Sequence, residues 1–284
     1  MHKIKLITDS TSDLSEELYQ EHDIDVVPLY VNFKDLSFRD NVDLKPQMMY
    51  DLVSQKGVLP KTAAASPGDF YDVFKQYLSE GYDIIYTGIG GNFSASLTSA
   101  NSAKQMLGSE KIHLMDSQNL SSGSGLLILK AAKYRSEGDS AETIVRKLEQ
   151  LRTRVRSQFV IETLDYLYKG GRLNALSAIM GTMLKLKPII KVKDGLMAVG
   201  KKPRGNSRIG IDLMIRELLD LKDRVDTDYI MITHSLAEEN AEYIRMELAK
   251  TNLEFKHIYT TSAGCVISSH CGKGTIGILY IEKE

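Results

Sequence analysis

Residues 87–99 combine side chains that could bind an anion with a backbone that could surround one. They read Thr-Gly-Ile-Gly-Gly-Asn-Phe-Ser-Ala-Ser-Leu-Thr-Ser and follow the apolar run Asp83–Tyr86. The glycines, Gly91 among them, allow sharp turns and a close approach to a ligand. Ser94 and Ser96 place hydroxyl groups and free backbone N–H groups where a helix is expected to begin, and such an end favours an anion.

Two more polar segments follow strand-like runs and precede helix-like ones. Residues 9–13 come after the alternating run Lys3–Ile7, and residues 116–121, which include Ser117, come after Lys111–Met115. Repeated strand, loop and helix units are typical of a parallel sheet with helices on both faces. Ligands of such sheets lie beyond the carboxyl ends of the strands, so we expect the three polar segments to converge there.

The segment Lys61–Asp69, which we expect to be a loop, carries a hydroxyl residue that helix capping does not explain. Ser66 precedes Pro67 and is a typical N-cap. Thr62 occupies no capping position, so a role in a turn and a role in ligand binding both stay open for it.

The pattern of elements predicts an α/β protein of two domains. Residues 1–155 are expected to form an N-terminal α/β domain with a mainly parallel sheet flanked by helices. Residues 156–284 are expected to form a C-terminal α/β domain with a mixed sheet and helices, including a hairpin through Asp194-Gly195. A ligand is expected between the two domains.

The run Lys169-Gly-Gly-Arg172 predicts a glycine turn that presents the guanidinium of Arg172. An apolar helix is expected to follow at 175–186. Its Met180 suits the deformable wall of a ligand pocket and ordinary core packing equally well, so both interpretations stay open.

His270 lies in the glycine-rich run 268–277, which we expect to be a loop that turns this side chain toward a ligand. The spacing Gly272-x-Gly-x-x-Gly277 precedes a strand, so it does not match the dinucleotide-binding pattern. Zinc ligation by His270, Cys265 and Cys271 lacks a fourth ligand at the usual spacing. We therefore expect neither a cofactor nor a metal ion.

An acyl hydrolase is the main alternative from a different functional class. Ser94 would be its nucleophile, His270 its general base, and Asp9 or Asp116 the acid that orients the base. No Gly-x-Ser-x-Gly sequence surrounds Ser94. The residue types alone leave this alternative open.

The composition is that of a globular protein without a strong field for nucleic acid. The 284 residues carry a net charge of -1, with 43% hydrophobic residues, which argues against nucleic-acid binding driven by overall charge. The N-terminal residues do not resemble a signal peptide and no apolar run approaches the roughly twenty residues of a membrane span. We expect a cytoplasmic protein.

Six segments spread over the whole chain resemble the DegV family of bacterial fatty-acid-binding proteins, the fatty-acid carriers of fatty-acid kinase systems. The segments are Ile7-Thr-Asp-Ser-Thr-Ser-Asp-Leu14, Lys61-Thr-Ala-Ala-Ala-Ser-Pro67, Phe93-Ser-Ala-Ser96, Asp116-Ser117, Lys169-Gly-Gly-Arg-Leu173 and His270-x-Gly-x-Gly274.

This resemblance implies a non-enzymatic carrier that binds one long-chain fatty acid, such as palmitate, and presents it to a partner kinase. It implies that Thr62 and Ser94 hold the carboxylate, that His270 lies beside it, and that Arg172 lies nearby. Ser96, Gly91 and Ser117 are expected to support the site. The sequence departs from the family pattern at Ala63 to Ala65, at Phe93 to Ser96 and at Lys273, which leaves Thr62, Ser94 and His270 in place.

The energetics of a fatty acid fit such a carrier. Burial of one methylene contributes about 0.8 kcal/mol, so a tail with on the order of fourteen of them contributes roughly 11 kcal/mol before the costs of ordering. The carboxylate must not be buried without partners, which explains hydroxyl and N–H donors at the polar end of an apolar tunnel. The expected helix 175–186, with Ile179, Met180 and Met183, is a hypothesis for part of the tunnel wall.

Overall fold

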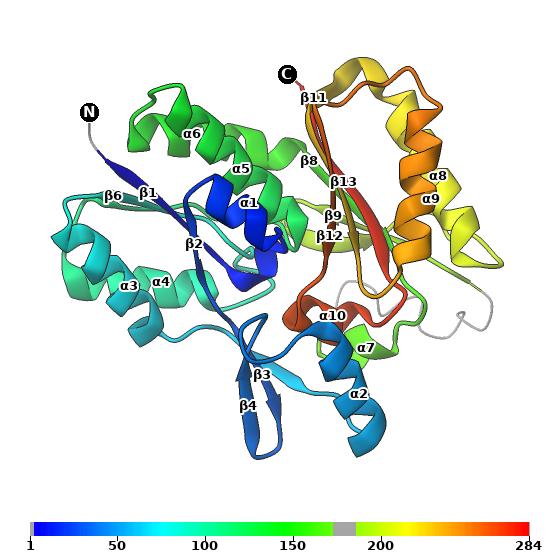
Figure 1. Cartoon of the computed structure of the whole chain (residues 1–284), viewed down its shortest axis with the longest axis horizontal. Helices are drawn as coiled ribbons and strands as arrows, with labels where there is room; N and C mark the ends of the chain where they lie inside the picture. Colours follow the sequence, from blue (N-terminus) through cyan, green and yellow to red (C-terminus); the bar gives the residue numbers. More distant parts are fainter. Residues whose placement is uncertain (1–2, 173–185, 284) are drawn as a thin grey trace.

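The N-terminal half forms a parallel sheet, as predicted. The computed structural model describes residues 3–172 and 186–283, and its first sheet has the order β2-β1-β6-β7 with all neighbouring strands parallel (Figure 1). These strands are β1 (Ile4–Asp9), β2 (Ile24–Val27), β6 (Asp83–Tyr86) and β7 (Ile112–Leu114). The order changes direction between β1 and β6, so the loops after these two strands diverge to leave a crevice, which is where such sheets bind ligands.

Helices cover both faces of this sheet. The helices are α1 (Glu16–Glu21), α3 (Pro67–Ser79), α4 (Ser96–Leu107), α5 (Ser122–Ser136) and α6 (Ala141–Leu151). In Figure 1, α3 and α4 lie on one side of β1 and β6, and α5 and α6 lie on the other. The predicted start of α3 is confirmed, because Ser66 and Asp69 form a reciprocal capping box around Pro67.

Helix α5 lies between the two sheets of the molecule. Its residues 122–132 are all buried, and the one charged residue among them, Lys130, forms ion pairs with Asp226 and Asp228. Leu126 and Leu129 belong to one apolar cluster with Leu6 of β1 and with Met231 and Leu279 of the second sheet. The two halves of the chain therefore share a core.

The second sheet has six strands in the order β10-β9-β8-β13-β11-β12 and is mixed. Its strands are β8 (Val155–Val160), β9 (Ile189–Lys193), β10 (Leu196–Val199), β11 (Val225–His234), β12 (His257–Ser262) and β13 (Ile276–Glu282). Only β11 and β12 are parallel neighbours within it. Helices α8 (Ser207–Asp220) and α9 (Glu238–Ala249) pack on the face away from α5 (Figure 1).

The predicted α/β fold class is thus confirmed in both halves. The hairpin β9–β10 turns at Asp194 and Gly195, with φ of 51° and 72°, as expected for an Asp-Gly hairpin turn. Strand β8 begins at Val155, next to the predicted boundary between residues 155 and 156. That division into two domains stays a prediction, because α5 joins both halves in one core.

A lobe built from β3 (Tyr30–Phe33), β4 (Leu36–Arg39) and α2 (Pro46–Lys56) projects from the molecule (Figure 1). Strand β5 (Lys61–Ala63) pairs with β3, so Thr62 lies in a strand and not in the loop predicted from the sequence. At Pro28, between β2 and β3, the chain leaves the parallel sheet and enters the small sheet of β3, β4 and β5.

The prediction of a loop at residues 268–277 is also wrong in part, because residues 268–271 are helical. Cys265–Cys271 form α10, which packs against α2, β5 and α7 (Asp165–Lys169). His270 therefore lies in the last turn of a short helix. The described residues also include the short 3₁₀ turns η1 (Ser10–Ser12), η2 (Arg152–Arg154) and η4 (Lys222–Arg224).

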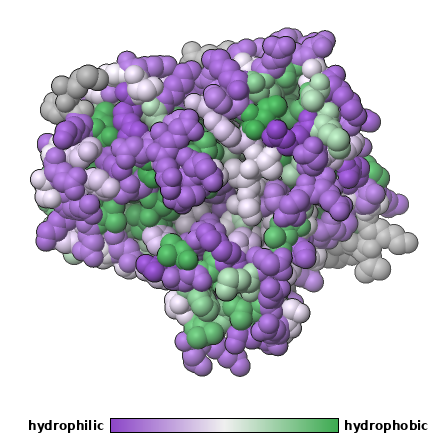
Figure 2. Space-filling model, in the orientation of Figure 1, coloured by the Kyte–Doolittle hydropathy of each residue, from purple (hydrophilic) through white to green (hydrophobic). Residues whose placement is uncertain are grey.

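The surface in Figure 2 is mostly polar, with apolar side chains gathered on the projecting lobe. Leu36 of β4 and Met48 of α2 are among the exposed apolar residues, at 44% and 55% exposure. Within 3–172 and 186–283, no helix has both the length and the apolar composition needed to cross a membrane.

Candidate functional site: a polar end on an apolar cavity

The three polar loops that follow β1, β6 and β7 converge, as predicted. Asp9, at the end of β1, accepts hydrogen bonds from the backbone N–H of Ile89 at 3.0 Å and from the hydroxyl of Tyr86 at 2.9 Å. Asp116, after β7, accepts from the backbone N–H of Gly91 at 3.1 Å. Burial raises the pKa of Asp9. Both carboxyls hold the loops together.

Two glycines of residues 87–99 are required by these loop contacts rather than by a ligand. A Cβ at Gly88 would lie 2.1 Å from the carboxylate oxygen of Asp9, and one at Gly90 would lie 2.9 Å from the backbone nitrogen of Asn119. At Gly91 the nearest atom would be 3.6 Å away, which is ordinary contact. Gly91 contributes its N–H to Asp116 and does not line the cavity described below.

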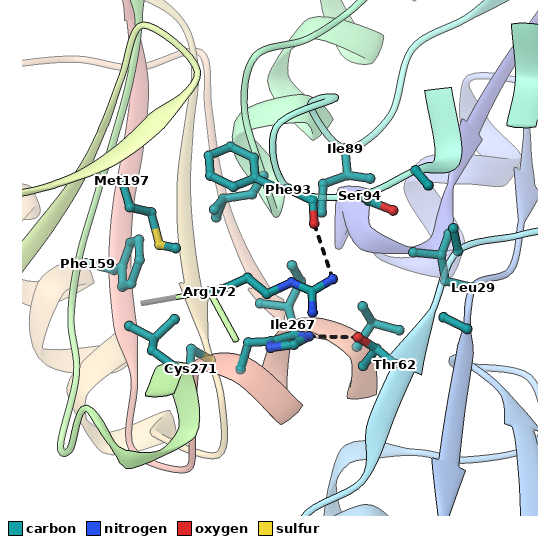
Figure 3. A pocket seen from close by; sticks show the side chains of 17 residues that line it. Leu29, Thr62, Ile89, Phe93, Ser94, Phe159, Arg172, Met197, Ile267 and Cys271 are labelled. Atoms are coloured by element: carbon teal, nitrogen blue, oxygen red, sulfur yellow. Dashed lines mark hydrogen bonds between the residues drawn. The ribbon is translucent and has the colours of Figure 1, made fainter. Parts of the chain in front are cut away.

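Thr62 and His270 form a hydrogen-bonded pair between β5 and α10. The distance between Thr62 Oγ1 and His270 Nε2 is 2.7 Å, and Figure 3 shows this bond at the edge of the cavity. The pKa of His270 falls from 6.5 to about 4, first because burial disfavours the imidazolium and second because the Arg172 guanidinium is near. His270 is therefore neutral at pH 7.

The neutral ring carries one hydrogen, and its environment favours one tautomer. Nδ1 of His270 is buried and has no hydrogen-bond partner among the described residues. A buried N–H without an acceptor is rarer than a buried acceptor without a donor, so we assign the hydrogen to Nε2. Nε2–H then donates to Thr62 Oγ1, which leaves the hydroxyl hydrogen of Thr62 free to donate to a ligand.

Ser94 lies just before α4, a helix whose N-cap, Ala95, provides no side-chain cap. The hydroxyl oxygen of Ser94 accepts from the backbone N–H of Ser96 at 3.2 Å and lies 2.9 Å from the hydroxyl of Ser96. Ser94 lines the cavity, whereas Ser96 is fully buried behind it. Ser117 is likewise buried and bonds the backbone of Asn119, so both serines support loops rather than the cavity surface.

Arg172 closes the polar end from the turn after α7. Its Nη1 donates to the backbone oxygen of Gly170 at 2.8 Å, and Nη2 lies 3.5 Å from the backbone oxygen of Phe93. A Cβ at Gly170 would lie 2.2 Å from Nδ1 of His270, so this glycine makes room for the imidazole. Figure 3 shows the guanidinium of Arg172 between Phe93 and Thr62.

These four side chains, Thr62, Ser94, Arg172 and His270, line a single cavity of 170 Å³ whose other walls are apolar. The apolar walls include Leu29, Ile89, Phe93, Phe159, Met197 and Ile267. A second apolar cavity of 40 Å³ adjoins it and shares Leu120, Phe159, Ile267 and Cys271. The predicted helix 175–186 lies outside the described residues apart from Leu186, so its proposed place in the wall stays a prediction.

The apolar lining was not predicted from the sequence. Leu29 lies in the connection between β2 and β3, Phe159 in β8 and Met197 in β10, so the three are far apart in the chain. In the sequence they look like ordinary strand residues, and only the meeting of the two halves shows which of them face a cavity.

A cavity that is apolar over most of its wall and has hydroxyl, imidazole and guanidinium groups at one end defines a site for an amphipathic, anionic molecule. The sequence profile of the DegV family, described as a family of uncharacterised proteins, matches residues 3–283. The chain therefore belongs to the DegV family.

Three relatives are similar to this chain over nearly their whole length, and two of them have solved structures that are described as binding fatty acids. A DegV domain-containing protein of Clostridium acetobutylicum is 35% identical over 286 residues and covers 100% of both chains. A DegV family protein of Thermus thermophilus, whose structure is described as fatty-acid binding, matches with a TM-score of 0.93 and 30% identity over 99% of each chain. A protein of Eubacterium ventriosum described as binding stearic acid matches with a TM-score of 0.88 and 28% identity, covering 100% of this chain and 99% of its own.

Proposed function

We propose that this protein is a fatty-acid carrier that binds one long-chain fatty acid, such as palmitate, with its carboxylate at the polar end of the cavity. The single observation that carries the proposal is the convergence of Thr62, Ser94 and Arg172 at one end of an apolar cavity. The fatty-acid and stearic-acid binding described for the relatives of Thermus thermophilus and Eubacterium ventriosum supports the same ligand class.

In this proposal the carboxylate accepts hydrogen bonds from the hydroxyls of Thr62 and Ser94, and the Arg172 guanidinium lies nearby at the solvent-exposed edge of the site. The Nε2–H of His270 orients the hydroxyl of Thr62 as a donor. Ser94 already accepts from the N–H of Ser96, so its own hydrogen is free to turn toward the ligand. A buried carboxylate thereby gains the hydrogen-bond donors that it needs in an apolar site.

The tail lies along the apolar walls and continues toward the second cavity. The two cavities share four residues, so a chain that runs from the polar end past Phe159 and Ile267 has an apolar path to Leu279. Burial of the methylenes provides most of the affinity, and the polar end provides the preference for an acid over an alcohol.

The arrangement does not favour the alternative of a Ser94 hydrolase. The Nε2 of His270 bonds to Thr62 rather than to Ser94, and Nδ1 has no orienting acid among the described residues. Asp9 and Asp116, the two candidate acids, accept from backbone N–H groups of the loop after β6. A nucleophile and base in contact, with the base oriented by a third group, are what this chemistry requires. We therefore propose a protein that binds and does not catalyse.

The test compares lipid binding in wild type and in a variant with both hydroxyls removed. We expect organic extracts of the purified protein to contain a fatty acid by mass spectrometry. Thr62→Val with Ser94→Ala should weaken fatty-acid binding by about tenfold or more, because two hydrogen bonds to a charged group are lost. The matched control is Thr98→Val with Ser99→Ala on α4, two residues that do not line the cavity.

Unchanged affinity in the cavity variant, with the control also unchanged, would show that the carboxylate lies elsewhere. Ester hydrolysis by the wild type that is lost in Ser94→Ala would instead establish the hydrolase. A purified protein without any lipid, which also fails to bind added fatty acid, would point to a protein that only interacts with other proteins.

We further propose that the carrier acts in the cytoplasm and presents its ligand to a partner kinase, as the family resemblance implies. Arg172 lines the cavity and is also exposed to solvent, so it can contact the ligand head group and a partner. Arg172→Ala should preserve most of the fatty-acid affinity and impair acyl-phosphate formation with a cognate kinase, as measured with labelled ATP. Lys169→Ala, which removes a nearby charge outside the cavity, is the control; loss of binding in Arg172→Ala would make the arginine mainly a direct ligand.

A further inference from the structure

A polar cavity with no role in the proposed fatty-acid site lies beside the loop that follows β7. It encloses 210 Å³ and is bounded by Gln118 and Asn119 of this loop, by η2 and the start of β8, and by the turn of the β9–β10 hairpin. We call it the basic cavity. The neighbouring residues Asn119 and Leu120 line different cavities, Asn119 the basic one and Leu120 the apolar one.

Positive charge dominates the lining of the basic cavity. Arg152, Arg156 and Lys193 line it together with one carboxylate, Asp194. Arg156 is already paired, since its Nε lies 2.6 Å from a carboxylate oxygen of Glu282. No carboxylate in 3–172 or 186–283 lies within ion-pair distance of Arg152 or Lys193, so two of the three cations are without a countercharge.

Arg152 also has a hydrogen-bond donor without a partner. Its Nη1 donates to the backbone oxygen of Asp116 at 3.0 Å, which fixes the side chain. Its Nε is buried and has no acceptor in the described part of the chain. Buried donors on charged groups are costly when they stay unpaired. This nitrogen has almost no accessible surface, so an anion in the basic cavity would meet the terminal guanidinium nitrogens of Arg152 rather than Nε.

Neutral donors surround the same space. The side-chain oxygen of Asn119 accepts from Ser157 Oγ at 2.6 Å and from the N–H of Leu120 at 3.1 Å. Because this oxygen already accepts two hydrogen bonds, a ligand would accept from the side-chain NH₂ of Asn119. Thr153 lines the cavity as well, and its hydroxyl donates to the backbone oxygen of Gln150 at 3.4 Å. The loop is held in place by Asp116, which accepts from the N–H of Gln118 at 3.0 Å.

We propose that the basic cavity binds a phosphate dianion, either free or as part of a small phosphate ester, through Arg152 and Lys193 with Asn119 as a neutral donor. Because Arg156 is paired with Glu282, the two unpaired cations Arg152 and Lys193 provide the positive charge for a dianion, and Asp194 adds one negative charge to the lining. Guanidinium groups suit phosphate oxygens because they donate two parallel hydrogen bonds. An adjoining cavity of 360 Å³ shares Arg156, Val192 and Lys193 and leaves room for the organic part of an ester.

The site does not depend on the proposed fatty-acid function, since none of its residues lines the apolar cavity. The test measures binding of two probes by calorimetry at constant ionic strength: inorganic phosphate, and glycerol 3-phosphate as a small monoester. Wild type should bind at least one of them at a single saturable site. Arg152→Gln and Lys193→Gln should each weaken that binding by about tenfold.

Arg146→Gln removes the same charge from an exposed position of α6 outside the cavity and should leave binding within about twofold of wild type. Arg152→Gln also removes a contact to Asp116, so Lys193→Gln, on the exposed hairpin turn, tests the site with that contact intact. Saturable binding lost in both cavity variants and kept in Arg146→Gln supports the proposal. Absence of saturable binding of both probes to wild type, or an equal loss in Arg146→Gln, overturns it.

Discussion

The imidazole of His270 is held neutral by its surroundings, and this gives its ring a measurable effect on stability. In the unfolded chain its pKa is the ordinary 6.5, and in the folded protein it is about 4. Between these two values the unfolded state binds a proton that the folded state does not. The free energy of unfolding that His270 contributes is therefore fully present above pH 6.5 and is lost as the pH falls toward 4.

We predict that His270→Asn removes this part of the pH dependence. From pH 7.5 to pH 4.5, the free energy of unfolding of wild type should fall by roughly 2–3 kcal/mol more than that of the variant. Urea unfolding at both pH values measures the four free energies. An equal pH dependence in the two proteins would mean that the ring is protonated in the folded state and is solvated more than its burial indicates.

The comparison with the variant is needed because buried carboxyls act in the opposite direction. Burial raises the pKa of Asp40 from 3.8 to about 6, so the folded state binds the extra proton in that range. The contribution of Asp40 to stability is present below pH 3.8 and is lost as the pH rises through 6. Asp40 is unchanged in His270→Asn, so its effect cancels from the difference between the two proteins.

At the scale of elements, the loop after β6 contains one glycine in a crowded place, Gly88, and one in an open place, Gly91. Substitutions at these two positions form a matched pair. Gly88→Ala should lower the free energy of unfolding by roughly 1–3 kcal/mol, because its Cβ would lie 2.1 Å from the carboxylate of Asp9. Gly91→Ala, in the same loop, should change it by less than about 0.5 kcal/mol, since its Cβ meets nothing closer than 3.6 Å. Thermal or urea unfolding of both variants checks this prediction. Similar losses of unfolding free energy in the two variants would show that the loss comes from the reduced backbone freedom of alanine and not from the contact with Asp9.

Long, periodic elements could be predicted from the sequence, and short ones that depend on distant partners could not. The helix of Phe70 and Phe74 and the Asp194-Gly195 hairpin carry their signals locally. Helix α10 has only seven residues, rich in Ser and Cys, which are weak helix formers. Its first N–H groups are satisfied by Asp13 and Asp40, since Gly264 N donates to Asp13 at 2.8 Å and Cys265 N to Asp40 at 2.7 Å. Acceptors more than two hundred residues away leave no local signal.

The same reasoning applies to the candidate site. Thr62, Ser94, Arg172 and His270 could be proposed from the sequence because polar residues beside glycines and helix starts stand out from a core pattern. That they line one cavity follows from the structure. The strand β5 that carries Thr62 has three residues and forms only because β3 lies beside it, so a strand was not predictable there. In the sequence, the residues of the apolar walls cannot be distinguished from other buried residues.

At the scale of the whole molecule, the cavity exists because the two halves are held together. Leu29 and Ser94 come from the first half, and Phe159 and His270 from the second. Helix α5 packs against both sheets and fixes their separation. A ligand in the cavity contacts both halves, so it should stabilise them as one unit; at a ligand concentration of 100 times its dissociation constant, the gain is about 2.7 kcal/mol.

The second apolar cavity then sets the length of tail that the protein accepts. Ala263 is 3% exposed and lines this cavity, so Ala263→Val should fill part of its 40 Å³ and exclude the end of a long tail. Loss of burial of two methylenes corresponds to about tenfold in affinity. We expect Ala263→Val to weaken the binding of an 18-carbon acid by roughly that factor and to leave that of a 12-carbon acid nearly unchanged, as measured with delipidated protein.

The control, Ala249→Val at the exposed end of α9, should affect the binding of neither acid. Equal weakening for both acids would mean that the substitution disturbs the fold near α10, and no change for either would mean that the tail takes another path from the polar end.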